Sequence, residues 1–396
     1  MKPLAGLRIL DLSRVLACPF ASMILAELGA EVIKVEQPGA GDETRGFEPF
    51  AEGPEGERVS GYYMACNRSK RSITVNLRSP EGAEIVRRLA AESDALVENF
   101  PTGTLKRRGL DYASLKAVNP RLVYVSCTGF GQTGPYAKRK GYDTVFQAMG
   151  GLLSLTGERG GGPVKPGLPV ADLTSGLWVA ISLLAALRGR DATGVGGHVD
   201  FSMFDGQVAL LTIAAARWFA LGEVPPRLGT EHPGRVPTAS FRCRDDRWLH
   251  ITCSDQHWAP LVAALGLQVD EGLATNAGRL ARRDEVMAML NAALAKVTRA
   301  EAVALLDAAD VPNGPVLAVD EVLRDEHVLA RGMVGGFDYP GLGAFPALPV
   351  PLKFDGWEAP EVGRPPLLGE HTEEILRDML GYDAGRIAAL REAKAI

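Results

Sequence analysis

The chain has 396 residues, of which 46% are apolar and 23% are charged, and its formal net charge is -5. This length exceeds what one compact core fills, so we expect two domains, and the composition is that of a globular rather than a disordered protein. The acidic balance argues against a nucleic-acid-binding protein, which would carry a basic domain with a basic patch.

Cysteine usage and hydropathy bear on the compartment. The five cysteines form no C-x-x-C pair, which argues against a zinc ribbon or a redox motif, and we expect no metal site. Met1–Arg14 lacks the apolar core of a signal peptide, and the longest apolar run, Leu177–Leu187, is too short to span a bilayer. The sequence therefore predicts a cytoplasmic protein in a reducing compartment, with no insertion into a membrane.

Strands and helices alternate through the first part of the chain. Short apolar runs predict strands, and amphipathic stretches bounded by Pro or Gly predict helices. The predicted strands are Arg8–Leu12, Val32–Val35, Ser72–Val75, Ala95–Val97 and Leu122–Ser126, and the predicted helices are Pro19–Leu28, Pro80–Ala91 and Leu115–Val118. This alternation favours an α/β domain whose parallel sheet is covered by helices on both faces.

The second part begins with two apolar helices, predicted over Asp172–Arg188 and Val208–Ala220. A loop rich in Pro and Gly, residues 225–237, then marks a domain boundary. Beyond it we expect two strands within Ala239–Cys253, helices over Arg283–Lys296 and Arg299–Ala309, a turn at Val311–Pro315 and a last helix near Glu373–Leu380. The predicted domains are a large domain (1–205), a linker helix and loop (206–235), a small domain (236–330) and a return to the large domain (331–396).

Gly129–Gly134 spells G-x-G-x-x-G after a predicted strand, the pattern of a dinucleotide-binding loop. Such a loop needs a helix that starts at once and holds the pyrophosphate, but here Pro135 and the polar run Lys138–Lys140 follow. We therefore interpret the segment as a flexible turn at the end of a strand. The sequence also lacks the motifs of a phosphate loop, a zinc protease and a serine hydrolase.

Asp172 stands directly before a long apolar helix, where Asp is a preferred N-cap residue. A carboxylate at a helix N-terminus also feels the positive end of the helix dipole and stays ionised. An ionised carboxylate can attack a thioester, which is covalent catalysis, and the pair Gly150-Gly151 leaves room for the ester to approach. The two interpretations of Asp172, helix cap and nucleophile, are compatible.

A series of short motifs in a fixed order spans nearly the whole chain. They are Leu4–Asp11, Leu28–Glu36, Pro38–Asp42, Asn67–Ser72, Val97–Phe100, Gly129–Pro135, Val311–Pro315 and Leu368–Thr372. With them the sequence resembles the class III coenzyme A transferases, the CaiB/BaiF-like family that includes formyl-CoA transferase and carnitine CoA transferase. The resemblance implies a Rossmann-like large domain, a smaller α+β domain, and a homodimer whose two chains interlock like rings.

The resemblance places the family's catalytic aspartate on Asp172, which would carry the acyl group as a mixed anhydride and then CoA as an aspartyl-CoA thioester. Acyl-CoA and free carboxylic acids are the implied substrates, with no tightly bound cofactor. The implied contacts with CoA are Arg14, Ala17, Lys70, Asn99, Phe100, Arg107, Lys140 and Tyr142, and the implied contacts with the acyl substrate are Leu16, His232 and Arg235. A solvated surface charge is the alternative for Arg107 and Lys140, and core packing is the alternative for Phe100.

Two departures from formyl-CoA transferase concern the substrate. Leu16 stands where that enzyme carries Gln, and Gly229–Pro237 stands in place of a run of glycines. The loop looks more like that of members that use dicarboxylates, with succinyl-CoA as the expected donor, and Arg235 or His232 would hold a distal carboxylate. Ordinary loop polarity is the alternative for these two residues.

Other chemistry on the same fold gives alternative functions. An acyl-CoA racemase needs a His where this chain has Tyr142, and a phenol is a poor base near neutral pH. A CoA-ester lyase or hydratase is compatible with Asp172. A catalytically silent acyl-CoA-binding protein is a further alternative, against which the presence of Asp172 counts.

Overall fold

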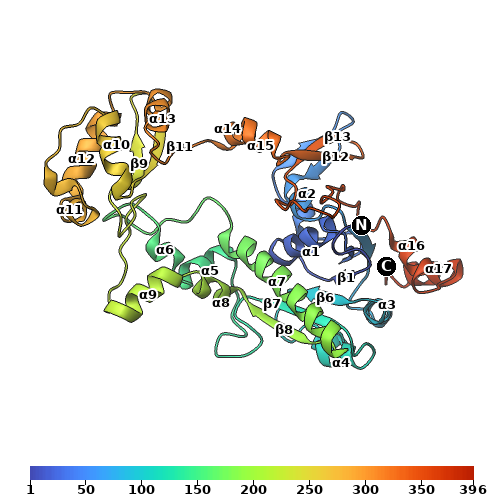
Figure 1. The fold of residues 1–396 in the computed structure, drawn as a ribbon. Helices are drawn as coiled ribbons and strands as arrows, with labels where there is room; N and C mark the ends of the chain where they lie inside the picture. The colour runs from blue at the N-terminus through green and yellow to red at the C-terminus, as the bar shows by residue number, and fades with distance from the viewer. The chain divides into compact units, whose positions relative to one another are not determined.

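The computed structural model describes all residues, 1–396. The chain forms two compact units, which we describe separately: unit 1 comprises Met1–Leu152, Pro166–Thr212 and Glu326–Ile396, and unit 2 comprises Leu153–Lys165 and Ile213–Asp325. Unit 2 thus begins earlier than the small domain predicted from residue 236, and it takes in a segment, 153–165, that the sequence had assigned to the large domain. Figure 1 shows the order of the elements by colour.

Unit 1 is built on a six-stranded sheet with the strand order β5-β2-β1-β6-β7-β8, in which every neighbouring pair is parallel. The strands are β1 (Arg8–Asp11), β2 (Glu31–Glu36), β5 (Arg71–Thr74), β6 (Ala95–Glu98), β7 (Val123–Thr128) and β8 (His198–Ser202). Counted along the chain this is the order 3-2-1-4-5-6 of a doubly wound Rossmann-type sheet. The predicted α/β class and its parallel sheet are confirmed.

Helices cover both faces of this sheet because side chains alternate along each strand. Ile9 points into a core formed with α1 (Ala17–Glu27) and α7 (Val170–Thr193), whereas Leu10 points into the opposite core with α3 (Pro80–Ala91). The Ser79 side chain caps α3 by accepting from the Gly82 amide, and Pro80 occupies the first turn, so the predicted bounds of this helix are confirmed.

Helix α7 has 24 residues and packs against α1. The two helices approach closely at Gly176, where an added Cβ would lie 2.7 Å from the Ala17 carbonyl oxygen. By length and composition alone α7 could also cross a membrane, but it contributes Val179 and Leu183 to the core of unit 1. The helix begins at Val170 with Pro169 as its N-cap residue, so the prediction that Asp172 is the N-cap is wrong, and Asp172 is the third residue of the helix.

The remaining elements of unit 1 surround this framework. They are β3 (Phe50–Glu52), β4 (Arg58–Ser60), α2 (Gly61–Cys66), α4 (Tyr112–Lys116), α5 (Asp143–Met149), α8 (Met203–Ala209), α15 (Glu326–Ala330), β12 (Gly335–Tyr339), β13 (Gly343–Ala347), α16 (Thr372–Asp378) and α17 (Ala384–Glu392). The sequence had predicted one helix over 208–220, but the structure has α8 followed by a separate helix, α9 (Thr212–Leu221), of which all but the first residue belongs to unit 2. Helix α17 was not predicted.

Unit 2 contains a three-stranded antiparallel sheet with the order β11-β10-β9. Its elements are β9 (Thr238–Arg242), β10 (Trp248–Thr252), α10 (Asp255–Ala264), α11 (Asn276–Ala281), α12 (Arg283–Leu294), α13 (Arg299–Ala308), β11 (Asn313–Pro315) and α14 (Val319–Val322). A short helix, α6 (Leu152–Leu155), lies at the boundary of the units. The prediction of a turn at Val311–Pro315 is wrong in part, because Asn313–Pro315 pairs with β10 as the third strand.

Candidate active site at the carboxyl edge of the sheet

A pocket of about 290 Å³ opens where the carboxyl ends of four parallel strands meet in unit 1. Its walls come from the segments that follow β1, β2, β5 and β6: Leu12, Ser13, Arg14, Lys34, Val35, Glu36, Gln37, Ala40, Gly41, Asp42, Glu43, Val75, Asn76, Leu77, Arg78, Phe100 and Arg108. In open α/β sheets ligands bind at this edge, next to the point where the strand order reverses. Here β1 and β6 flank that point.

Positive charge gathers around the pocket. Arg14, Arg78 and Arg108 line it, and burial together with the neighbouring cations Arg78, Arg107 and Arg14 lowers the pKa of Arg108. Arg14 already pairs with Glu43 at 2.7 Å, whereas the planar guanidinium groups of Arg78 and Arg108 match the geometry of phosphates. The pocket is therefore suited to a phosphorylated ligand.

Three of the predicted CoA contacts meet in one wall of the pocket. The Asn99 side chain accepts a hydrogen bond from the Arg14 amide (2.9 Å) and donates one to the Arg14 carbonyl (2.7 Å). The Arg14 guanidinium lies over the Phe100 ring, 5.0 Å from its centroid. Arg107 is exposed, and its hydrogen bond is a long one to Thr104, so Arg108 rather than Arg107 lines the pocket.

Asp172 is half-buried in the first turn of α7, and its amide donates a hydrogen bond to Oδ1 of Asp143, 3.1 Å away. The other oxygen of Asp143 accepts from Nε2 of Gln147 (2.6 Å). Burial and the neighbouring Asp143 carboxylate raise the pKa of Asp172 to about 7. We had expected the helix dipole to keep this group ionised, but a dipole contributes only about 0.3–1 kcal/mol, so the other two effects prevail.

Tyr62 of α2 is a neighbour of Asp172 that the sequence did not reveal. Burial, together with the carboxylates of Asp172 and Asp143, raises the pKa of Tyr62 to about 12. Its ring packs edge-on against Phe47, with the centroids 5.6 Å apart. The phenol therefore stays protonated and can donate a hydrogen bond at neutral pH. No local motif marks Tyr62, because the fold brings it to Asp172 from a distant part of the chain.

The N-terminus of α1 lies at the same edge as that of α7, since both helices run antiparallel to the strands they connect in a doubly wound sheet. Leu16 is the N-cap residue of α1 and Ala17 its first residue, and both side chains are buried. The first amide groups of a helix have no partner within the helix. Here they become donors beside the sheet edge.

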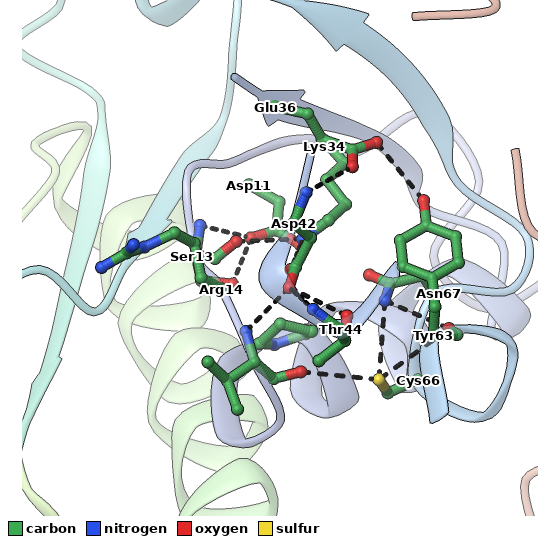
Figure 2. Close-up of polar contacts among 12 residues, drawn as sticks. Asp11, Ser13, Arg14, Lys34, Glu36, Asp42, Thr44, Tyr63, Cys66 and Asn67 are labelled. Carbon is green, nitrogen blue, oxygen red and sulfur yellow. Dashed lines mark hydrogen bonds and ion pairs between the residues drawn. The ribbon is translucent and has the colours of Figure 1, made fainter. Parts of the chain in front are cut away.

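Beneath the pocket lies a buried network of charges, drawn in Figure 2. Nζ of Lys34 pairs with Oδ2 of Asp42 at 2.8 Å and also donates to the Ser13 carbonyl (3.0 Å). Although burial opposes ionisation, the ammonium groups of Lys70 and Lys34 hold the pKa of Asp11 below its usual range. The network thus pairs buried groups of opposite charge, and two of them, Lys34 and Asp42, also line the pocket.

Lys70 belongs to this network and does not line the pocket, contrary to the interpretation as a contact with CoA. Its ammonium group donates to Oδ2 of Asp11 (3.0 Å), to the Pro19 carbonyl (2.9 Å) and to Oδ1 of Asn67 (2.9 Å). All its donors are used within the protein, and the side chain is fully buried. Lys70 therefore helps to fix the floor of the site through contacts within the protein.

The other predicted contacts are dispersed. Lys140 and Tyr142 lie on the loop after β7, where both are exposed, and Tyr142 precedes α5. The G-x-G-x-x-G segment is a loop with no helix until Asp143. His232 and Arg235 are exposed residues of unit 2, whereas Asp172 belongs to unit 1, so their role in substrate recognition stays a prediction.

We also considered metal-ligating groups and cysteine thiols in the rest of the chain. No group of three or more His, Cys, Asp and Glu side chains could hold a metal ion. The cysteines are free thiols and all are buried. The titratable groups with shifted pKa values at this edge of unit 1 include the carboxyl group of Asp172 and the phenol of Tyr62.

The fold and the site define an α/β enzyme of the Rossmann type, with a cationic pocket at the point where the strand order reverses and a carboxyl side chain at the same edge. The chain matches the sequence model of CoA-transferase family III over residues 4–372 and belongs to that family. It is an enzyme that transfers CoA.

Similar proteins agree with this assignment over nearly the whole chain. The chain is 39% identical to a succinyl-CoA:glutarate CoA-transferase of Mus musculus, over 98% of this chain and 89% of the relative. It is 38% identical to a succinate–glutarate CoA-transferase of Agrobacterium fabrum, over 95% of this chain and 96% of the relative. A solved structure of a CAIB/BAIF family protein from Brucella suis superposes with a TM-score of 0.87 at 42% identity, covering 96% of this chain and 99% of that one.

Proposed function

We propose that this enzyme moves CoA from succinyl-CoA, or a similar dicarboxylyl-CoA, to a second dicarboxylic acid such as glutarate. The names of the two relatives support these substrates. The observation that carries the mechanism is the half-buried carboxyl group of Asp172. Burial limits its contact with water and raises its pKa to about 7, so that a poorly hydrated and therefore reactive carboxylate forms near neutral pH.

The pocket would receive the nucleotide part of CoA. The phosphates of CoA suit the cluster of Arg14, Arg78 and Arg108, and the adenine suits the apolar surface of Phe100. The thioester end would then extend along the carboxyl edge toward Asp172. CoA and the acids are substrates in this scheme, and the chemistry needs no further cofactor.

The transfer would proceed through covalent intermediates on Asp172. Its carboxylate attacks the thioester carbonyl, the C–S bond breaks, and a mixed anhydride and the CoA thiolate result. The thiolate attacks the aspartyl carbonyl of the anhydride, which releases the first acid as a carboxylate and leaves an aspartyl-CoA thioester. The acceptor carboxylate attacks this thioester to form a second anhydride and the thiolate, which then attacks the acyl carbonyl and regenerates Asp172.

Each attack passes through a tetrahedral oxyanion, and the same edge of the sheet supplies donors for it. The free amide groups of Ala17 and Cys18 open α1, at the positive end of its dipole. The Tyr62 phenol adds a protonated donor near Asp172. These groups act where charge develops, so they favour the transition state over the bound thioester.

A homodimer is the second part of the proposal, and exposed apolar side chains on α7 support it. Leu177 is 48%, Trp178 40% and Ile181 56% exposed, although α7 is otherwise a core helix. Large apolar side chains grouped on one helix face favour a protein–protein interface. We propose that a second copy of the chain covers this face, in the interlocked arrangement that the resemblance to the family implies.

The experiment for the reaction combines labelling with peptide mapping. Incubation with succinyl-CoA and labelled glutarate should give labelled glutaryl-CoA without ATP, and D172N should reduce this rate by at least about 1,000-fold. E81Q, which removes a carboxylate from the first turn of α3, is the matched control and should keep the wild-type rate. Protein quenched during turnover should carry an acyl or CoA adduct on the peptide that contains Asp172. An adduct confined to another residue, or exchange of the α-hydrogen with solvent in place of transfer, would reject this function.

A further inference from the structure

Val15 has an unusual backbone for its residue type. Its φ is 69°, in the left-handed region, which a β-branched side chain rarely adopts. It lies in the middle of the loop that joins β1 to α1, between Arg14 and the N-cap residue Leu16. A residue keeps such a conformation only when its surroundings hold it there, and such residues cluster at functional sites.

The side chain of Asp42 holds Val15 from one side. The Val15 amide donates to Oδ1 of Asp42 at 3.3 Å, and the same oxygen accepts from the amide and the hydroxyl of Thr44, at 3.0 and 2.8 Å. The second oxygen of Asp42 pairs with Nζ of Lys34 at 2.8 Å, with both side chains almost completely buried. Figure 2 shows this carboxylate at the centre of the network.

Contacts on either side of Val15 fix the rest of the loop. Sγ of Cys66 lies 3.6 Å from the Val15 carbonyl oxygen and 3.2 Å from that of Tyr62, so its one hydrogen is shared between them. Nζ of Lys34 donates to the Ser13 carbonyl at 3.0 Å. Arg14 is held at both its amide and its carbonyl by Asn99. Lys34 therefore acts twice, once on the loop directly and once through Asp42.

This loop connects the two working parts of the site. Ser13 and Arg14 line the cationic pocket, as does Asp42 itself. Ala17, two residues after Val15, is the first residue of α1. Its carbonyl oxygen lies against Gly176 of α7, which is one helical turn beyond Asp172. A change of φ at Val15 would therefore move the pocket wall and the first turn of α1 relative to each other.

We propose that Asp42 is a positioning residue for acyl transfer, which holds Val15 in the left-handed conformation and thereby aligns the start of α1 with Asp172. In this role Asp42 contacts neither Asp172 nor the acyl group, and it acts through the loop that joins β1 to α1. The proposal rests on the proposed function, because the alignment matters for attack on a thioester bound in the pocket.

Two substitutions and their combination test the proposal. D42N keeps an oxygen that can accept from the Val15 amide but loses the pairing with Lys34 that orients the side chain toward Val15. It should therefore lower kcat by about 30- to 100-fold, with less than about a 3-fold change in the Kd of CoA measured by calorimetry, since misplacement of reacting groups by about 1 Å has such an effect on rate. V15G should lower kcat by only about 2- to 5-fold, because glycine adopts a positive φ without being held. In the V15G background, D42N should then lower kcat by less than about 5-fold.

This reduced loss in the double variant separates positioning from a structural role. If Asp42 only stabilised the fold through Lys34, D42N would have the same effect in both backgrounds, and that result would overturn the proposal. So would a D42N enzyme with wild-type kcat. D246G is the control. It places glycine at another position with a positive φ (60°), in the turn between β9 and β10 of unit 2, and it should keep the wild-type kcat.

A second measurement covers the case in which D42N does not fold. V15P forces a negative φ and removes the same amide, but leaves the Asp42–Lys34 pair intact, so it should lower kcat as much as predicted for D42N. Hydrogen exchange of the peptide spanning 12–18 gives a readout without turnover. The exchange should accelerate in D42N and in V15P, and unchanged protection would refute the role of Asp42. Absence of CoA transfer in the wild-type enzyme would instead reject the proposed function and leave this exchange result to decide the role of Asp42.

Discussion

The amide of Asp172 donates a hydrogen bond to the carboxylate of Asp143, so the fold places two carboxyl groups at the N-terminus of α7. One of them, Asp143, holds the backbone that carries the other. The same proximity raises the pKa of Asp172 further than burial would alone. Asp143 thus both holds the backbone at Asp172 and adds to the rise in pKa that burial produces.

The first prediction concerns the pH profile of this pair. Burial and Asp143 raise the pKa of Asp172 to about 7, so kcat/KM should fall as the pH drops below 7 and Asp172 becomes protonated. D143N removes the neighbouring charge and should move this acid limb to lower pH, while the introduced amide can still accept from the Asp172 amide. A profile of kcat/KM from pH 5 to 9 measures the shift. An acid limb that stays in place would show that Asp143 does not tune Asp172.

The second prediction links Asp172 to stability. Its pKa is raised from 3.8 in an unfolded chain to about 7 in the fold, so its contribution to stability is complete below pH 3.8 and is lost as the pH rises through 7. D172N, which stays neutral, should exceed the wild type in stability at pH 8 by about 1–2 kcal/mol after allowance for solvent at this half-buried site. Calorimetric melting at pH 8 and pH 5 should show a larger gain in Tm at pH 8. Equal gains at both values would contradict the prediction.

The third prediction distinguishes Arg108 from Arg107. Arg108 lines the pocket and Arg107 is exposed, so R108A should raise the Kd of CoA by about 10-fold and R107A by much less. Because the lost contact would be to a phosphate, a pantetheine thioester should bind both variants as it binds the wild type. R377A, at an exposed position of α16, controls for a general change in charge. If R107A proved the more damaging substitution, the pocket would not be the phosphate site.

The fourth prediction follows from the enclosed ammonium group of Lys70. K70M leaves the buried carboxylate of Asp11 without its ion-pair partner and should destabilise unit 1 by about 3–5 kcal/mol. Denaturant unfolding, followed by the fluorescence of unit 1, measures the loss. In the fraction that folds, the Kd of CoA should change less than in R108A. A stable K70M protein with weak CoA binding would instead restore the interpretation of Lys70 as a ligand contact.

The fifth prediction tests the apolar face of α7. I181E places a carboxylate next to Leu177 and Trp178 on the exposed face of α7. Because this charge would lose its hydration in an interface, the substitution should convert a dimer into monomers. Sedimentation at micromolar concentration measures the mass. A388E puts the same charge on the exposed side of α17 and should leave the mass unchanged. A wild-type protein that sediments as a monomer would remove the basis for the dimer.

Much of the framework of unit 1 could be predicted from the sequence, because strand periodicity and helix capping are local signals. Ser79 and Pro80 mark the start of α3, and the alternation of strands and helices predicted the parallel sheet. The short strand Asn313–Pro315 was missed because a segment rich in Pro and Gly resembles a turn until its pairing partner is known.

The candidate site was predictable only in part, for a similar reason. Arg78 and Arg108 lie in no motif that we interpreted, and they line one pocket only because separate strands end at one edge. Tyr62 also lies in no such motif, and only the fold brings it near Asp172. The burial of Lys70 was not foreseen, because burial cannot be seen in a local sequence and a lysine is usually exposed. Packing of the strands and the segments that follow them decides which cationic side chains line the pocket.

The edge strand β5 of unit 1 is completed by residues from the far end of the chain. The His371 amide donates to the Ser72 carbonyl, the Thr372 hydroxyl accepts from the Thr74 amide, and the Asn76 amide donates to the carbonyl of Ala395. During translation, β5 therefore waits for some 300 further residues before its cover is synthesised. An exposed edge invites pairing with other chains in the interval. The nascent protein thus has a long window of vulnerability to aggregation, which a chaperone bound until release from the ribosome would shield.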